Sequence, residues 1–99
     1  MLKKLKICGF DFKIIYKNLV VESGDSCLGC CKSDANIIEI KKGIIPQRED
    51  EVILHESIHA MSDIMNLNLD ENTVNTLGVV VIDFIKSNPK FINKTMEDK

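Results

Sequence analysis

Apolar and polar side chains alternate in the first part of the chain, as expected for half-buried β-strands. The stretches "KLKICG" and "FDFKIIYKN" meet at Gly9, which indicates a short hairpin. In "NIIEIKK", Ile38 and Ile40 alternate with Glu39 and Lys41. Between them, "VVESGDSCLGCCKSDAN" is rich in Gly, Ser, Asp and Asn and is expected to be a loop. The sequence therefore predicts a sheet of about three strands and a cysteine-containing loop within residues 1–45.

The second part has the three-to-four residue spacing of amphipathic helices. Pro46 and the acidic stretch "EDE" begin a helix over residues 46–67, whose apolar positions are Val52, Leu54, Ile58, Met61 and Met65. "NLNLD" interrupts the pattern, and Asp70 is a suitable N-cap for a second helix over residues 70–88, which Asn88-Pro89 ends. Residues 89–99 are expected to form a polar, frayed tail. The predicted fold class is α+β, with the sheet first and two helices after it.

Length and charge restrict the function classes. A chain of 99 residues suits a single domain, residues 1–99, with one compact site. The net charge of -2 argues against nucleic acid as a partner, and no apolar run approaches the roughly 18 residues of a membrane helix. The N-terminus lacks the apolar core of a signal peptide. We therefore expect a cytoplasmic protein that is a monomer, touches neither membrane nor nucleic acid, and keeps its four cysteines as thiols.

The stretch "VILHESIHAMSDI" carries the candidate chemistry, because His55, Glu56 and His59 have the spacing H-E-x-x-H. On a helix, residues four apart lie on one face, so His55 and His59 can direct two imidazoles at one zinc ion. Glu56 lies at the edge of that face, where its carboxylate can reach a zinc-activated water instead of the ion. These are also the only two histidines of the chain.

A catalytic zinc site usually has three protein ligands and an open position for water. Candidates for the third ligand are Asp63, Asp70, Glu71 and Asp83. Asp63 is four residues after His59, where the helix has risen away from the ion, so a supporting hydrogen bond is expected of it. Glu71 begins the next helix, which a short connection folds back towards the histidines. We expect Glu71 to be the third ligand, with Asn75 on the same face able to brace a histidine or Glu71 itself.

"HESIH" followed by "DENTVNTLG", in a short chain whose sheet precedes its two helices, resembles the gluzincin metallopeptidases. Among them it is most similar to the minigluzincins and to short HExxH proteins of phages and prophages. The resemblance implies that His55, His59 and Glu71 bind zinc and that Glu56 is the general base and acid. Asn75 stands where larger gluzincins have an aspartate. A second downstream histidine is missing, which leaves Tyr16 as a candidate for stabilising the oxyanion.

The implied activity is hydrolysis of a peptide bond in a peptide or protein substrate, by a zinc-activated water from which Glu56 takes the proton. The substrate would lie extended along an edge strand, for which "NIIEIKK" is the candidate. The resemblance also implies latency, with the terminal "KTMEDK" lying in the cleft and Glu97 and Asp98 near the zinc.

Two alternatives remain open. Cys27 and Cys30 could join His55 and His59 in a Cys2His2 structural zinc site, which would give Glu56 no role. A second possibility is a non-catalytic binding module of phage type that keeps zinc only to stabilise a small core.

Overall fold

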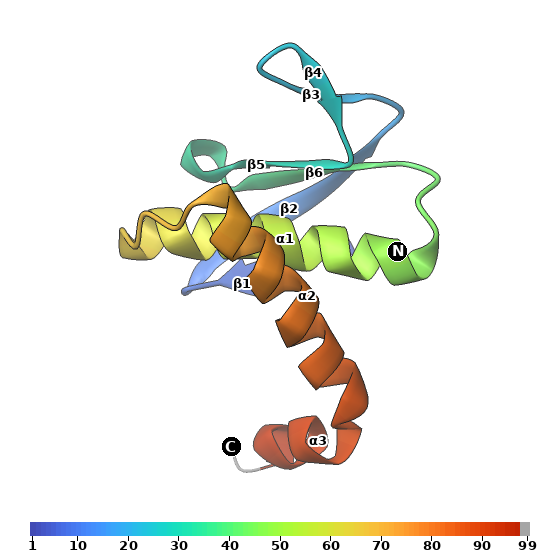
Figure 1. The fold of residues 1–99 in the computed structure, drawn as a ribbon, viewed down its shortest axis with the longest axis vertical. Helices are drawn as coiled ribbons and strands as arrows, with labels where there is room; N and C mark the ends of the chain where they lie inside the picture. The colour runs from blue at the N-terminus through green and yellow to red at the C-terminus, as the bar shows by residue number, and fades with distance from the viewer. Residues whose placement is uncertain (98–99) are drawn as a thin grey trace.

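The computed structural model describes residues 1–97 and shows an α+β fold, as predicted, with the strands first and the helices after them (Figure 1). Six short strands form a four-stranded sheet and a separate hairpin, so the sheet is larger than the expected three strands. The strands are β1 (Lys4–Ile7), β2 (Phe10–Lys17), β3 (Val20–Glu22), β4 (Asp25–Cys27), β5 (Gly29–Lys32) and β6 (Ile37–Lys41). A 3-10 turn, η1 (Ser33–Ala35), precedes β6. The helices are α1 (Pro46–Met65), α2 (Glu71–Ser87) and α3 (Pro89–Glu97).

The main sheet has the strand order β1-β2-β6-β5. β1 and β2 form the predicted hairpin at Gly9, whose φ of 85° suits a residue without a Cβ. β2 and β6 run parallel, and β5 pairs antiparallel with β6. "NIIEIKK" is therefore a central strand, and the prediction that it forms the edge is wrong. The edge beside the helices is β5, which lies in the segment expected to be a loop.

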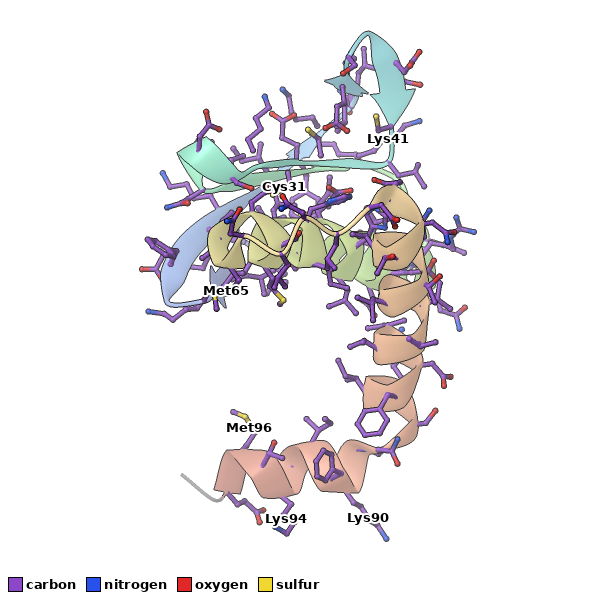
Figure 2. The ribbon with its side chains drawn as sticks, turned by 60° about the vertical axis from the view of Figure 1, so that its left-hand side comes forward. Cys31, Lys41, Met65, Lys90, Lys94 and Met96 are labelled. Carbon is purple, nitrogen blue, oxygen red and sulfur yellow. The ribbon has the colours of Figure 1, made fainter. Side chains whose placement is uncertain are left out.

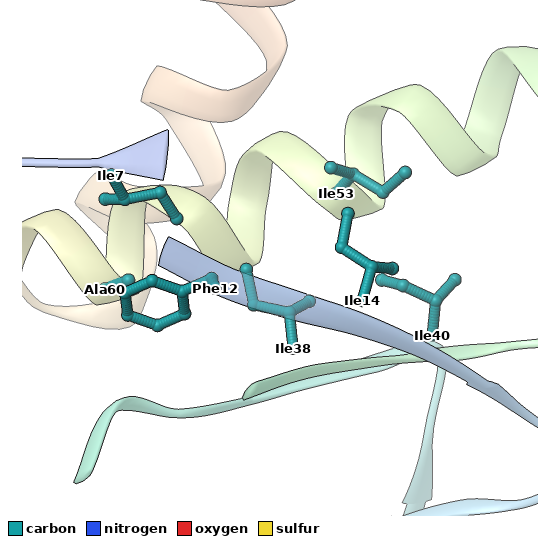
Figure 3. Packing of buried hydrophobic residues seen from close by; sticks show 7 residues of the cluster. All are labelled: Ile7, Phe12, Ile14, Ile38, Ile40, Ile53 and Ala60. Atoms are coloured by element: carbon teal, nitrogen blue, oxygen red, sulfur yellow. The ribbon is translucent and has the colours of Figure 1, made fainter. Parts of the chain in front are cut away.

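The core fills the space between the sheet and α1. Ile53 and Ala60 of α1 face the apolar side chains of β2 and β6, with Ile7 beside them (Figure 3). Phe12, Ile38 and Ile40 are completely buried, and each contributes roughly 1.5–3 kcal/mol to the burial free energy. The alternation seen in the sequence thus places one face of the sheet against α1.

The opposite face of the sheet carries a buried charge. The Glu39 carboxylate accepts hydrogen bonds from Lys17 at 3.1 Å and Lys32 at 3.3 Å. Burial alone would raise the pKa of Glu39, but these two ammonium groups outweigh it and lower the pKa. Glu39 pairs with Cys30 in the β5–β6 register, so the Cys30 side chain shares this face and points away from α1.

Residues Pro89–Glu97 are helical where a frayed tail was expected. α2 runs away from the body of the molecule, and α3 follows it after a sharp turn at Asn88-Pro89 (Figure 1, Figure 2). Within residues 1–97, no helix has the length and apolar character needed to span a membrane.

Candidate metal centre

Helix α1 presents the two histidines of the HExxH motif on one side. Their ring centroids are 4.9 Å apart, in an edge-to-face arrangement. Both side chains remain partly exposed, with 19% of His55 and 28% of His59 accessible to solvent. Their four-residue spacing therefore gives two imidazoles that share one surface, as the motif predicts.

The connection between α1 and α2 brings a third polar group to the histidines. Asn66 and Asn68 both adopt left-handed backbone conformations with φ of 56°, which reverses the chain in a few residues. The Ser62 hydroxyl accepts a hydrogen bond from the Leu69 N–H at 3.0 Å and ties the turn to α1. Asp70 caps α2 by accepting a hydrogen bond from the Thr73 N–H at 2.8 Å, which also lowers the pKa of Asp70. α2 thus begins with Glu71 directly over the histidines.

Glu71 touches both histidines at once. Its Oε1 lies 2.9 Å from His55 Nε2, and its Oε2 lies 3.0 Å from His59 Nε2. Within residues 1–97, these three residues form the one group of His, Cys, Asp or Glu side chains able to share a metal ion, with ligand atoms all within 4.8 Å of one another.

The donor set suits zinc. Two imidazole nitrogens and one carboxylate oxygen are the ligands of an open catalytic zinc site. Ligand atoms about 2.0–2.1 Å from a tetrahedral zinc ion lie about 3.4 Å from one another. The ligand atoms of His55, His59 and Glu71 lie within 4.8 Å of one another, so small movements of these side chains would make room for a zinc ion. Gly78 of α2 lies against His55 of α1, where a Cβ would make an ordinary contact 3.7 Å from His55 Cα.

Glu56 is buried beside this cluster, with 8% of the residue exposed. Its Oε2 lies 4.0 Å from His55 Nε2. Burial raises the pKa of Glu56 to about 7, and the negative charges of Glu22 and Glu71 act in the same direction, while a hydrogen bond from the Cys31 backbone N–H opposes them. A carboxyl group with a pKa near 7 can both accept and return a proton at neutral pH.

The edge strand β5 lies against Glu56, a contact that the sequence did not reveal. A Cβ at Gly29 would lie 2.7 Å from Val52 Cγ1 and 3.0 Å from Glu56 Cγ, so any other residue there would force these side chains to move. The one signal available was a glycine in the middle of "CLGCC", which marks a close backbone approach as readily as a turn.

A pocket of about 640 Å³ opens over these residues, between β5 and the start of α2. His55, Glu56, His59 and Glu71 line it together with the strand residues Gly29 and Cys31. Arg48, two helical turns before His55, supplies a cationic side chain to the lining. Arg48 was also missed in the sequence, because nothing in its surroundings distinguishes it from an ordinary exposed arginine.

Other residues singled out in the sequence have different roles. Asp63 lines the pocket, but its carboxylate accepts a hydrogen bond from Ser33 at 2.6 Å, which ties η1 to α1. Asn75 lines the pocket. Tyr16 donates its hydroxyl hydrogen to the Leu2 carbonyl oxygen at 2.7 Å and does not line the pocket, so the suggestion that it stabilises the oxyanion is wrong.

The structure does not bring Cys27 and Cys30 to the histidines as a Cys2His2 site requires. Cys27 lies at the pocket, where its thiol donates to the Asp25 carbonyl oxygen at 3.4 Å. Cys30 lies on the far face of the sheet, and burial, followed by the charges of Glu22, Glu56 and Glu39, raises its pKa to about 11. A thiol with this pKa is a poor source of the thiolate that binds zinc.

The expected blocking of the cleft by "KTMEDK" is not seen for its described residues. Lys94–Glu97 belong to α3, and no α3 residue lines the pocket. Asp98 lies outside the described residues.

Comparison with models of known protein families, with curated proteins and with solved structures gives no match.

The packing of β5 on α1 can be tested by adding one methyl group at each of two glycines. Gly29→Ala should destabilise the fold by about 1–3 kcal/mol, because its Cβ overlaps Val52 and Glu56. Gly78→Ala is the matched control and should be neutral or stabilising by up to about 1 kcal/mol, since its Cβ makes an ordinary contact and alanine favours a helix. Urea unfolding measures both. Equal effects of the two substitutions would contradict the close approach at Gly29.

Proposed function

We propose that this protein is a zinc-dependent peptidase of the gluzincin type, in which His55, His59 and Glu71 hold the ion and Glu56 is the general base. The observation that carries the proposal is the contact of one Glu71 carboxylate with both histidines, 2.9 and 3.0 Å away, beside a buried Glu56. Zinc held by these three side chains would acidify a water molecule and polarise the substrate carbonyl group.

The other steps belong to residues of the chain. Glu56, buried with its Oε2 4.0 Å from His55 Nε2, accepts the proton of the attacking water and then delivers it to the departing amine nitrogen. The Cys31 N–H donates to this carboxylate, so the edge strand fixes its position. Glu71 would supply the third ligand, and its contacts with both imidazoles already bring the three ligand groups together.

The substrate would lie along β5, which has a free edge on the side of the pocket. An extended peptide can add to such an edge through main-chain hydrogen bonds, which require no particular side chains. β5 thus takes the place of β6 in the proposed substrate geometry.

The alternative of a non-catalytic module stabilised by zinc shares the same three ligands. The feature that favours an enzyme is Glu56, because a structural site has no use for a buried carboxyl group that lies beside the ligands without being one of them.

Glu71→Ala should weaken zinc binding by more than about tenfold, because it removes a ligand. Removing a group that only supports a ligand already weakens metal binding by about tenfold or more. Asp83→Ala, on the same helix and outside the pocket, is the control and should bind zinc as the wild type does. Cys27→Ser and Cys30→Ser should also retain zinc. Calorimetric zinc titration of the four variants gives the affinities. Loss of zinc in the cysteine variants and its retention in Glu71→Ala would contradict the ligand assignment.

Glu56→Gln should keep zinc and the fold but lower peptidase activity by at least about a hundredfold, because an amide cannot accept the proton. Glu49→Gln, in the first turn of α1 and outside the pocket, serves as the control. Cleavage of unfolded casein or of a peptide library, followed by mass spectrometry, provides the readout. Full activity in Glu56→Gln would exclude Glu56 as the base, and a wild type that binds zinc but cuts nothing would favour the binding module.

A further inference from the structure

A second hollow continues from the pocket over the proposed metal ligands, at the start of α1. Its volume is about 250 Å³, and it shares Leu28 and Arg48 with the larger pocket. The rest of its lining comes from the end of β6 and the connection to α1, namely Lys41, Lys42, Gly43 and Ile44. Three of its lining residues are therefore cationic, and none is acidic. We call this region the cationic hollow.

The charges of the cationic hollow are not neutralised by the protein itself. Among residues 1–97, neither its two lysines nor Arg48 forms an ion pair. Asp50, in the same turn of α1 as Arg48, is instead paired with Lys86 at 3.0 Å. Glu51 lines the larger pocket but not the cationic hollow. Three like charges in one concave site attract anions, so this hollow is suited to a negatively charged ligand.

The edge strand β5 leads to the cationic hollow. Leu28 immediately precedes β5, and its carbonyl oxygen accepts a hydrogen bond from the Lys41 N–H at 2.9 Å. Figure 2 shows Lys41 at the foot of the β3–β4 hairpin, with Cys31 further along β5. A peptide lying along the free edge of β5 would therefore extend from the proposed metal ligands into this hollow.

β5 and α1 run in the same direction. Gly29, at the start of the strand, lies against Val52, and Ser33, just after its end, donates a hydrogen bond to Asp63. The starts of both elements therefore lie together at the cationic hollow. A peptide that adds to β5 as an antiparallel strand, the commoner kind of pairing, would run the opposite way. The C-terminal side of the cut bond would then lie in the hollow.

The distance along α1 predicts which substrate residue reaches the hollow. Arg48 precedes His55 by seven residues. Seven residues rise about 10 Å along a helix, which is the length of about three residues of an extended peptide. The substrate residue that meets the cations is therefore about the third one after the cut bond.

We propose that the cationic hollow binds acidic side chains of the substrate, Asp or Glu about three residues beyond the cut bond on its C-terminal side. This inference rests on the proposed peptidase function and adds a class of substrate to it. Carboxylates form hydrogen-bonded ion pairs with Arg and Lys, and the hollow offers three such partners. No aromatic side chain lines the hollow for a nucleobase to stack on, which favours an acidic peptide over a nucleic acid.

Peptide binding tests the proposal independently of cleavage. The zinc-loaded Glu56→Gln protein is titrated against two fluorescent peptides of about ten residues, which differ only in carrying three glutamates or three glutamines. Fluorescence anisotropy should show about tenfold tighter binding of the acidic peptide, as expected for three exposed ion pairs, and added salt should reduce the difference.

Adding Lys41→Gln, Lys42→Gln and Arg48→Gln together should remove this preference. The matched control combines Lys3→Gln, Lys4→Gln and Lys13→Gln, which remove the same charge from exposed positions outside both hollows. The control should keep the preference for the acidic peptide, and circular dichroism checks that both triple variants are folded. Equal loss of the preference in the two triple variants would show that only the net charge matters and would overturn the proposal.

Cleavage of a peptide library by the wild type, followed by mass spectrometry, tests the position. Asp and Glu should be enriched about three residues after the cut bond. A library cut without this enrichment would overturn the inference but leave the peptidase supported. Preferred binding of the acidic peptide with no cleavage would contradict the peptidase and support the hollow as a site for acidic peptides. Equal binding of the two peptides, or tighter binding of a single-stranded oligonucleotide, would overturn the inference.

Discussion

The contact of the Glu71 carboxylate with His55 and His59 is the interaction on which the candidate metal centre depends. The left-handed Asn66 and Asn68 reverse the chain, and the Asp70 cap begins α2 at the position that makes this contact possible. α2 then crosses α1 with Gly78 lying against His55. A salt bridge to an exposed carboxylate contributes little stability by itself. The consequence of this contact is therefore geometric, because it gathers the ligand atoms of two helices at one point.

The burial of Glu56 depends on a second close approach, that of β5 to α1. Gly29 allows the strand to lie against the side chain, which removes the carboxyl group from water and raises its pKa to about 7. The same strand offers a free edge to the pocket. The contact of β5 with α1 thus both raises the pKa of Glu56 and places a free strand edge next to it. The proposed peptidase mechanism requires the carboxyl group and the substrate-binding edge to be neighbours.

Much of this arrangement can be predicted from residue spacing, and the remainder depends on contacts that spacing does not encode. The helix period of residues 46–67 and the short "NLNLD" turn were enough to place Glu71 near His55 and His59. β5 was missed because "CLGCC" has turn-forming composition and no alternation, and it becomes a strand only by pairing with β6. The choice of β6 as the edge failed for the same reason, since strand order follows from long-range pairing. α3 was taken for a tail because "KFINKTMEDK" is largely polar, and its helix packs on α2 through the Phe84–Phe91 ring contact, which spacing alone does not reveal.

The central claim is that two imidazoles and one carboxylate, with no thiolate, hold a single metal ion. The absorption spectrum of the cobalt-substituted protein tests it most directly, because Co²⁺ accepts the same nitrogen and oxygen ligands as zinc and, unlike zinc, absorbs visible light. We expect one equivalent of Co²⁺ to give the visible bands of a low-coordinate site without the intense near-ultraviolet band of cobalt bound to thiolate. A strong thiolate band, or no cobalt bound at all, would contradict the assignment of His55, His59 and Glu71 as the ligands.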